Sequence, residues 1–191
     1  MLIDRAATLG YPAVALLDRD GVSGAPRFHK AALAAGIRPL IGAEITIETG
    51  QQASRLAGQQ GNTKFSLPVL CASQEGWRNL CRLLSRMKLR APKGEGALAI
   101  HELDGFTTGL IAMPGRPLLR AEQFGVGGLL DRVVGVFGRG QTYVALQRHL
   151  QRDQEDDNDA LVCLADAYRV PLVATGGVAL PHRKTVRCST C

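Results

Sequence analysis

The sequence predicts an α/β fold in a single domain. The main observation is that short apolar runs alternate with longer amphipathic stretches and that Gly or Pro separates them, which is the pattern of repeated strand and helix units. A length of 191 residues with 46% hydrophobic content provides enough side chains for one buried core. Because a connection between parallel strands needs a crossover helix, the alternation favours a parallel barrel or an open doubly wound sheet.

Short apolar runs bounded by turn residues are expected to form the strands. They are Ala13–Leu17, Leu40–Ile47, Leu67–Ala72, Leu110–Met113, Tyr143–Leu146 and Pro171–Ala174. The first run, AVALL, is continuously apolar, as in strands that are buried on both faces of a parallel sheet. Residues 48–64 are rich in Gly, Gln and Ser, and we expect an exposed insertion or a hairpin loop there.

The longer stretches between these runs are expected to form helices. They are Met1–Leu9, Ser23–Ala35, a helix that starts at Ser73, Leu118–Phe124, Leu129–Phe137 and a helix from Asp156 to about Tyr168. Gly10 and Gly36 follow the first two helices, where a left-handed residue is favoured, and Ser23 is expected to cap the second. Aspartates at the start of the last helix suit the positive end of its dipole; they are Asp156, Asp157 and Asp159.

The helix that starts at Ser73 has two distinct faces. Apolar side chains fall at helical spacing on the expected buried face, which consists of Trp77, Leu80, Cys81, Leu84 and Met87. Arg78, Arg82 and Arg86 lie four residues apart on another face. These three arginines could contact DNA or a protein partner, and a solvated helix face is the alternative.

Composition limits the class of protein. The net charge of +6 and a pI near 9.4 favour anionic partners such as nucleic acid. No uninterrupted apolar run reaches about 18 residues, which excludes a membrane-spanning helix, and the N-terminal stretch has no apolar core of a signal peptide, so a cytoplasmic location is expected. Five cysteines are an odd number, which indicates reduced thiols rather than a disulfide framework.

Residues 1–180 form the expected domain, and residues 181–191 form an irregular tail without periodicity. Cys188 and Cys191, with His182 nearby, have the outline of half a zinc site. A shifted or truncated reading frame is the alternative explanation of this tail.

In barrels and open α/β sheets the chemistry lies at the carboxyl ends of the strands. In this chain those ends hold few metal ligands. The candidates are Asp18 and Asp20 after the first strand, Glu44 in the second and His149 after the fifth. The chain has four histidines, and only His149 lies at an expected strand end, so the set is small for a hydrolytic metal centre.

Several separate blocks of the sequence resemble one known family. The blocks are LGYPAVALLDRDGVSGAPRFHKAALAAGIRPLIGAEI, LCASQEGWRNLCRLLS, YVALQRHLQRD and VPLVATGGV. In this order and spacing they resemble the PHP (polymerase and histidinol phosphatase) domain of bacterial replicative DNA polymerase alpha subunits, most closely the error-prone branch. The resemblance implies a distorted TIM-like barrel of alternating strands and helices, related to phosphoesterases, with metal ions at the strand ends.

The same resemblance implies that this chain has lost most of the family's metal ligands. The His-x-His pair of the family's first strand is absent, so we expect a barrel without its first strand, truncated at both ends. The family's Thr-Asp-His-Asp-Gly stretch reads Leu-Asp-Arg-Asp-Gly here, which places Arg19 where the ligand histidine would stand. Glu44 and His149 match retained ligands, whereas Gly177 and Ala179 replace the late Asp-x-His pair. No catalytic residue is assigned.

Arg19 carries a fixed positive charge among carboxylates. Such a guanidinium could neutralise side chains that a metal would otherwise neutralise. We therefore hypothesise that Arg19 pairs with Glu44 or Asp18 and replaces the ion. A zinc, manganese or magnesium ion is expected only if the remaining ligands still bind one.

Three functions stay open from the sequence. The first is a structural scaffold within an error-prone polymerase of the alpha type. This scaffold is expected to contact the polymerase core, other replication or repair subunits, and DNA through its basic surface. No membrane is expected among its partners. In the resembling family the activity is that of a DNA-directed DNA polymerase, and this chain alone is expected not to catalyse it. The second is a phosphoesterase with a reduced metal site. The third is a gene remnant without function.

Overall fold

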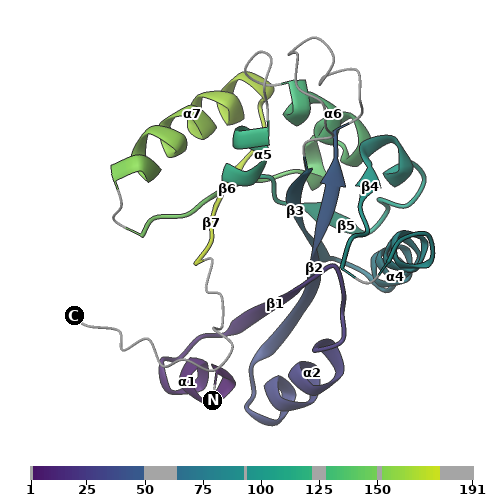
Figure 1. Ribbon diagram of the computed structural model, residues 1–191. Helices are drawn as coiled ribbons and strands as arrows, with labels where there is room; N and C mark the ends of the chain where they lie inside the picture. Colours follow the sequence, from purple (N-terminus) through teal and green to yellow (C-terminus); the bar gives the residue numbers. More distant parts are fainter. Residues whose placement is uncertain (1, 50–63, 93, 122–127, 150–151, 177–191) are drawn as a thin grey trace.

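A sheet of mixed direction forms the centre of the fold (Figure 1). The computed structural model describes residues 2–49, 64–92, 94–121, 128–149 and 152–176. In this sheet β2 (Arg38–Glu48) pairs in parallel with β1 (Ala13–Arg19) and with β4 (Leu98–Ala99). On its other side, antiparallel pairing joins β2 to β3 (Lys64–Cys71) and β3 to β5 (Leu110–Ala112).

A second, small sheet consists of β6 (Val144–Leu146) and β7 (Leu172–Ala174), which are parallel. A single parallel bridge between Ala112 and Thr142 connects the end of β5 to the segment before β6. Among the described residues no pairing joins β7 to β1, so the strands follow an open course and do not close into a barrel.

The helices surround these sheets. They are α1 (Leu2–Thr8), α2 (Ala25–Ala34), α4 (Gln74–Leu89), α5 (Arg116–Ala121), α6 (Gly128–Phe137) and α7 (Arg152–Tyr168), with short 3-10 helices η1 (Ile100–Leu103) and η2 (Arg139–Gln141). In Figure 1, α1 and α2 lie beside β1, α4 lies beside the central sheet, and α7 lies beside β6 and β7. No helix in the described ranges is long and apolar enough to cross a membrane.

The α/β class is confirmed, but the expectation of parallel strands throughout is wrong. β3 runs antiparallel to both of its neighbours. The expected insertion or hairpin loop falls on residues 50–63, which lie outside the described residues. The expectation that AVALL is buried on both faces is also wrong, because β1 is an edge strand and Ala15 is exposed.

Most helix signals are confirmed. Gly10 and Gly36 adopt φ angles of +71° and +70°, and the Ser73 hydroxyl accepts the Gly76 N–H at 3.1 Å as an N-cap. Two expectations are wrong. Ser23 does not cap α2, whose N-cap position is Gly24 without a side-chain bond. The described part of α7 begins at Arg152, so Asp156, Asp157 and Asp159 lie beyond its first turn.

The main core lies between the central sheet and α4, α6 and α7. One face of β2 and β3 supplies fully buried apolar side chains, which are Ala43, Ile45, Ile47, Leu67 and Val69. They pack in one cluster with Leu80 and Met87 of α4. A smaller cluster under α1 and α2 contains Ile3, Phe28 and Ala32. Burial of each such Ile, Leu or Val side chain stabilises the fold by roughly 1.5–3 kcal/mol.

An ion pair fixes the segment that follows α4. Arg90 Nη2 donates to Glu102 Oε2 at 2.7 Å and to the Ala97 carbonyl at 3.0 Å, and the same Glu102 oxygen accepts the Ala99 N–H at 2.8 Å. The hydrogen bond from Arg90 lowers the pKa of Glu102 to about 2, and the Ala99 N–H contributes in the same direction. This carboxylate therefore holds the end of α4 against η1.

We predict that Gly76→Ala destabilises the protein by roughly 1–3 kcal/mol, because the added Cβ would lie 1.9 Å from the Gly109 carbonyl oxygen and the backbone must shift. Gly135→Ala in α6 is the matched control. No atom lies within 4 Å of its added Cβ, so the better helix propensity of Ala should leave stability equal or raise it by up to about 1 kcal/mol. Urea unfolding of both variants measures this difference, and equal effects would contradict the close packing of α4 on Gly109.

We predict that Glu102→Gln destabilises the protein by about 1–2 kcal/mol at neutral pH. Because the folded-state pKa of Glu102 is lowered to about 2, its contribution is complete above the ordinary pKa of 4.5 and is lost as the pH falls from there toward 2. Unfolding free energies of wild type and variant should therefore converge in acid. Glu95→Gln, at an exposed position nearby, is the control, and a difference that is constant with pH would contradict the ion pair.

Candidate functional site

The Asp18-Arg19-Asp20 sequence spans the last two residues of β1 and the first residue of the loop after it, and both of its carboxylates accept hydrogen bonds from the fold. Asp18 Oδ2 accepts the Gly24 N–H at 2.6 Å, at the start of α2. Asp20 Oδ1 accepts the Thr46 N–H at 2.7 Å, and its Oδ2 accepts the Thr46 hydroxyl at 2.8 Å. Asp20 has a φ of +49°, a conformation in which Asp is tolerated better than most residues. The two aspartates therefore close the loop against α2 and β2.

Glu44 lies beside this loop because β1 and β2 pair in parallel with Arg19 opposite Glu44. The Asp20 N–H donates to the Glu44 carbonyl at 2.9 Å, and the Ser66 hydroxyl donates to Glu44 Oε2 at 3.3 Å. The structure thus brings together the predicted residues Asp18, Arg19 and Glu44 at one end of β1.

Arg19 is exposed, and within the described parts of the chain no ion pair joins it to Asp18 or Glu44. The aspartates of the loop are held by backbone N–H groups and by Thr46 instead. The replacement of a metal by Arg19 stays a prediction. A different cation also lies near the loop, since a Cβ added to Gly21 would be 3.4 Å from Lys88 Nζ of α4.

His149 belongs to another part of the fold. It follows β6, whose strand partner among the described residues is β7, and β6 touches the sheet of Glu44 only through the segment at the end of β5. The side chain is exposed, and the backbone N–H donates to Gln154 Oε1 at 2.7 Å. The neighbouring Arg148 forms a two-point ion pair with Glu155, at 2.8 and 2.9 Å. The segment at His149 is therefore attached to the first turns of α7.

The described residues do not bring together the donor set of the metal centre that the fold implies. Across the described residues no group of three or more His, Cys, Asp or Glu side chains could hold a metal ion. Arg19 cannot serve as a ligand, because a guanidinium stays protonated and has no lone pair to offer. Gly177, Ala179 and the Cys188, Cys191 and His182 group lie outside the described residues. Glu44 and His149 as remaining ligands stay predictions.

The half-buried Cys71 does not add a reactive site. Cys71, Cys81 and Cys163 are free thiols. Burial raises the pKa of Cys71 to about 11, and Cys81 adds to this shift. A thiol with such a pKa is almost fully protonated at neutral pH and is a poor nucleophile or metal ligand.

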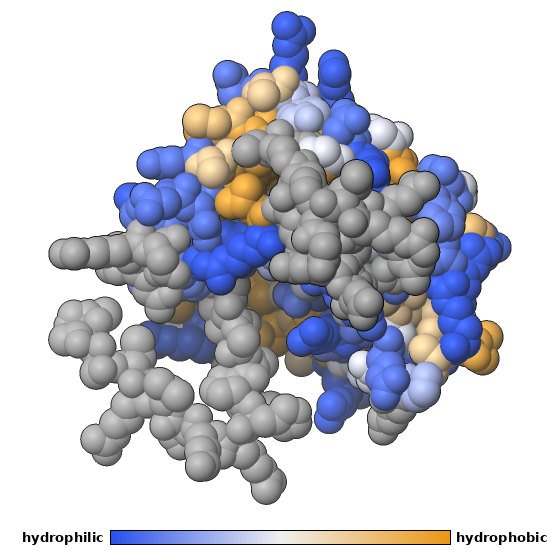
Figure 2. All heavy atoms as spheres, turned by 45° about the horizontal axis from the view of Figure 1, so that its top comes forward, coloured by the Kyte–Doolittle hydropathy of each residue, from blue (hydrophilic) through white to orange (hydrophobic). Residues whose placement is uncertain are grey.

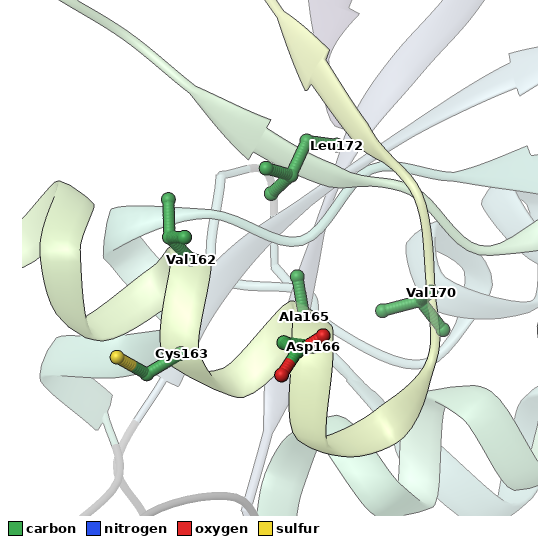
Figure 3. Close-up of a pocket in the computed structure, with 6 residues that line it drawn as sticks. All are labelled: Val162, Cys163, Ala165, Asp166, Val170 and Leu172. Atoms are coloured by element: carbon green, nitrogen blue, oxygen red, sulfur yellow. The ribbon is translucent and has the colours of Figure 1, made fainter.

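Two hollows in the described part of the chain are lined by residues other than the predicted ligands Asp18, Glu44 and His149. One, of about 240 Å³, is lined by Arg82, Leu83, Arg86 and Phe106. The other, of about 510 Å³, lies between α7 and β7 and is mostly apolar, as Figure 3 shows. It is lined by Val162, Cys163, Ala165, Asp166, Val170 and Leu172. The predicted contact residues Arg78, Arg82 and Arg86 are all exposed on α4.

Sequence reasoning missed two residues that matter here. Thr46 lies two positions after Glu44 on the same strand, and the two-residue period of a strand could have identified it on the same face. Phe106 follows η1 and contacts Arg86 only through the tertiary structure, with the Arg86 Cζ atom 4.9 Å from the ring centroid. No local pattern in the sequence marks that contact.

Comparison with known proteins agrees with this architecture. The family model described as PHP domain matches residues 1–157. The error-prone DNA polymerase of Alkalilimnicola ehrlichii is 36% identical over 96% of this chain, and the DNA polymerase III subunit alpha of Pseudomonas aeruginosa is 31% identical over 93% of it. These alignments cover only 16% and 15% of the two relatives, so the chain spans about one sixth of their length.

The fold also matches a solved structure. The crystal structure of a protein from Bifidobacterium adolescentis, provisionally assigned as a metal-dependent phosphoesterase, superposes with a TM-score of 0.53 over 91% of this chain and 79% of the other, at 13% identity. This likeness concerns the fold alone and is consistent with a distorted TIM-like arrangement that is not closed in the described residues. With the family match over most of its length, the chain belongs to the PHP domain family.

Proposed function

We propose that this chain is the PHP domain of an error-prone DNA polymerase of the alpha-subunit type and that it acts as a structural scaffold in DNA synthesis and lesion repair. The similarity to named polymerases over more than nine tenths of the chain supports the family context. The observation that carries the scaffold role lies at the carboxyl end of β1, where Asp18 and Asp20 bind backbone N–H groups and Thr46. These carboxylates join secondary-structure elements together.

The same geometry opposes a metal-dependent phosphoesterase. A metal would have to compete with charge-assisted hydrogen bonds of 2.6–2.8 Å at Asp18 and Asp20. At the position between them, Arg19 brings a positive charge, which raises the energy of a nearby divalent cation. We therefore assign no catalytic role to Glu44 or His149 and treat them as vestigial ligands.

The proposed partners are the polymerase core, other replication or repair subunits and DNA, in the cytoplasm. No membrane is among them. A scaffold of this kind needs a rigid core and an accessible charged surface, and both the buried sheet and the exposed arginines of α4 suit that role.

We predict that Asp20→Ala destabilises the protein by about 2 kcal/mol, because two hydrogen bonds are lost and the N–H of the buried Thr46 loses its acceptor. Asp104→Ala, at an exposed position outside this loop, is the matched control and should change stability by less than about 0.5 kcal/mol. The free energies of unfolding are measured by chemical denaturation with a chelator present, so that any loss of stability in the variant cannot come from a lost metal ion. An Asp20→Ala protein as stable as wild type would refute the structural role.

The scaffold proposal is tested by co-expressing this chain with the remaining part of an error-prone polymerase that lacks its own PHP domain. We expect the two to purify as a complex, and we expect the chain alone not to hydrolyse bis-p-nitrophenyl phosphate with Mn²⁺ or Zn²⁺ present. Two results together would replace the scaffold by an enzyme. They are stoichiometric metal bound by the purified chain and phosphodiester hydrolysis that is lost in both Glu44→Ala and His149→Ala.

A further inference from the structure

The hollow beside α4 combines two arginines with an aromatic ring. It is lined by Arg82, Leu83, Arg86 and Phe106 and measures about 240 Å³. We propose that it binds a backbone phosphate of single-stranded DNA, with Arg82 and Arg86 as the phosphate ligands and Phe106 as the group that positions Arg86. The choice of DNA as the ligand rests on the proposed function.

Phe106 positions one of the two charges. The Arg86 Cζ atom lies 4.9 Å from the centroid of the Phe106 ring, within the range of a cation–π interaction. A guanidinium held on a ring keeps N–H donors free for an oxyanion, and it loses less rotamer freedom when the anion binds. The Arg86 side chain is therefore preorganised for phosphate binding.

A buried amide positions the second charge. Arg82 Nη1 donates to Asn79 Oδ1 at 3.4 Å, and the Asn79 amide in turn donates to the Thr108 carbonyl at 3.0 Å. Asn79 is 3% exposed and is thus fixed in the core. This contact orients Arg82 without neutralising its charge.

The charges of Arg82 and Arg86 are not compensated by nearby carboxylates. In the described ranges neither forms an ion pair, whereas other arginines do so, namely Arg90 with Glu102, Arg116 and Arg120 with Asp157, and Arg148 with Glu155. Two unpaired guanidiniums on one hollow attract an anion, and the guanidinium fork matches the oxygens of a phosphate. Figure 2 shows blue hydrophilic side chains, with orange hydrophobic ones beside them, along the right-hand edge, on the side where Figure 1 places α4.

An aromatic wall favours a nucleic acid over an acidic peptide. Phe106 is partly exposed, so a base next to the bound phosphate can contact the part of the ring that Arg86 leaves uncovered, whereas a Glu or Asp side chain gains little from the ring. Arg78 belongs to the same row of α4 but does not line the hollow. It offers a control with the same charge on the same helix.

The test measures binding of fluorescein-labelled oligothymidylate of about 12 nucleotides to the full chain by fluorescence anisotropy at several salt concentrations. We expect Arg86→Gln to weaken binding roughly five- to tenfold and to reduce the salt slope by about 1. Arg82→Gln should act in the same direction. Phe106→Leu keeps every charge, and we expect it to weaken binding roughly two- to fivefold. Arg78→Gln should change binding by less than about twofold.

Three results would overturn the site. The first is an equal loss of binding in Arg78→Gln and Arg86→Gln, which would indicate a diffuse positive field. The second is unchanged binding in Phe106→Leu. The third is displacement of the labelled oligonucleotide by polyglutamate as effectively as by unlabelled oligothymidylate. A thermal unfolding measurement on each variant checks that it is folded. Because Arg86 is exposed, its replacement should leave the core intact. A chain that joins the polymerase complex but binds no oligonucleotide would refute this site and leave the scaffold standing. The opposite pair of results would refute the scaffold alone.

Discussion

The pairing of β2 with three other strands is the constraint on which the rest of the structure depends. β2 hydrogen-bonds with β1, β3 and β4, so a change in its register would affect the whole central sheet. Its alternate residues Ala43, Ile45 and Ile47 are completely buried. A slip by one residue would place Glu44 and Thr46 in the core and expose the apolar set to water. The burial of Ala43, Ile45 and Ile47 on one face of β2 thus places Glu44 and Thr46 on its opposite face.

That register determines what the strand ends can do. With Glu44 and Thr46 on the face opposite the core, Thr46 meets Asp20 and Glu44 meets Ser66. Polar groups that could serve an ion instead satisfy one another and the backbone. In a fold that commonly places chemistry at this end of its strands, these hydrogen bonds contribute to stability.

The distribution of charge points to a different functional surface. Carboxylates at the end of β1 are engaged within the fold, and several arginines are paired with Glu or Asp. Arg82 and Arg86 of α4 form no ion pair in the described ranges, which is why we propose them as ligands of an external anion. The proposed scaffold would gain from this division, because its fold would not depend on the surface that meets the partner.

The sequence by itself determined the class of fold and most of the helix caps and left-handed turn residues. Gly10, Gly36 and Ser73 adopt the roles that their chemistry predicts, because left-handed backbone and N-caps depend on a few neighbouring residues. It also brought Asp18, Arg19 and Glu44 to one end of the sheet. Only the tertiary structure decided that β3 runs antiparallel, that Asp20 binds Thr46 and that Arg86 lies over Phe106. Those features depend on contacts between segments distant in the chain, whose energies no local pattern encodes.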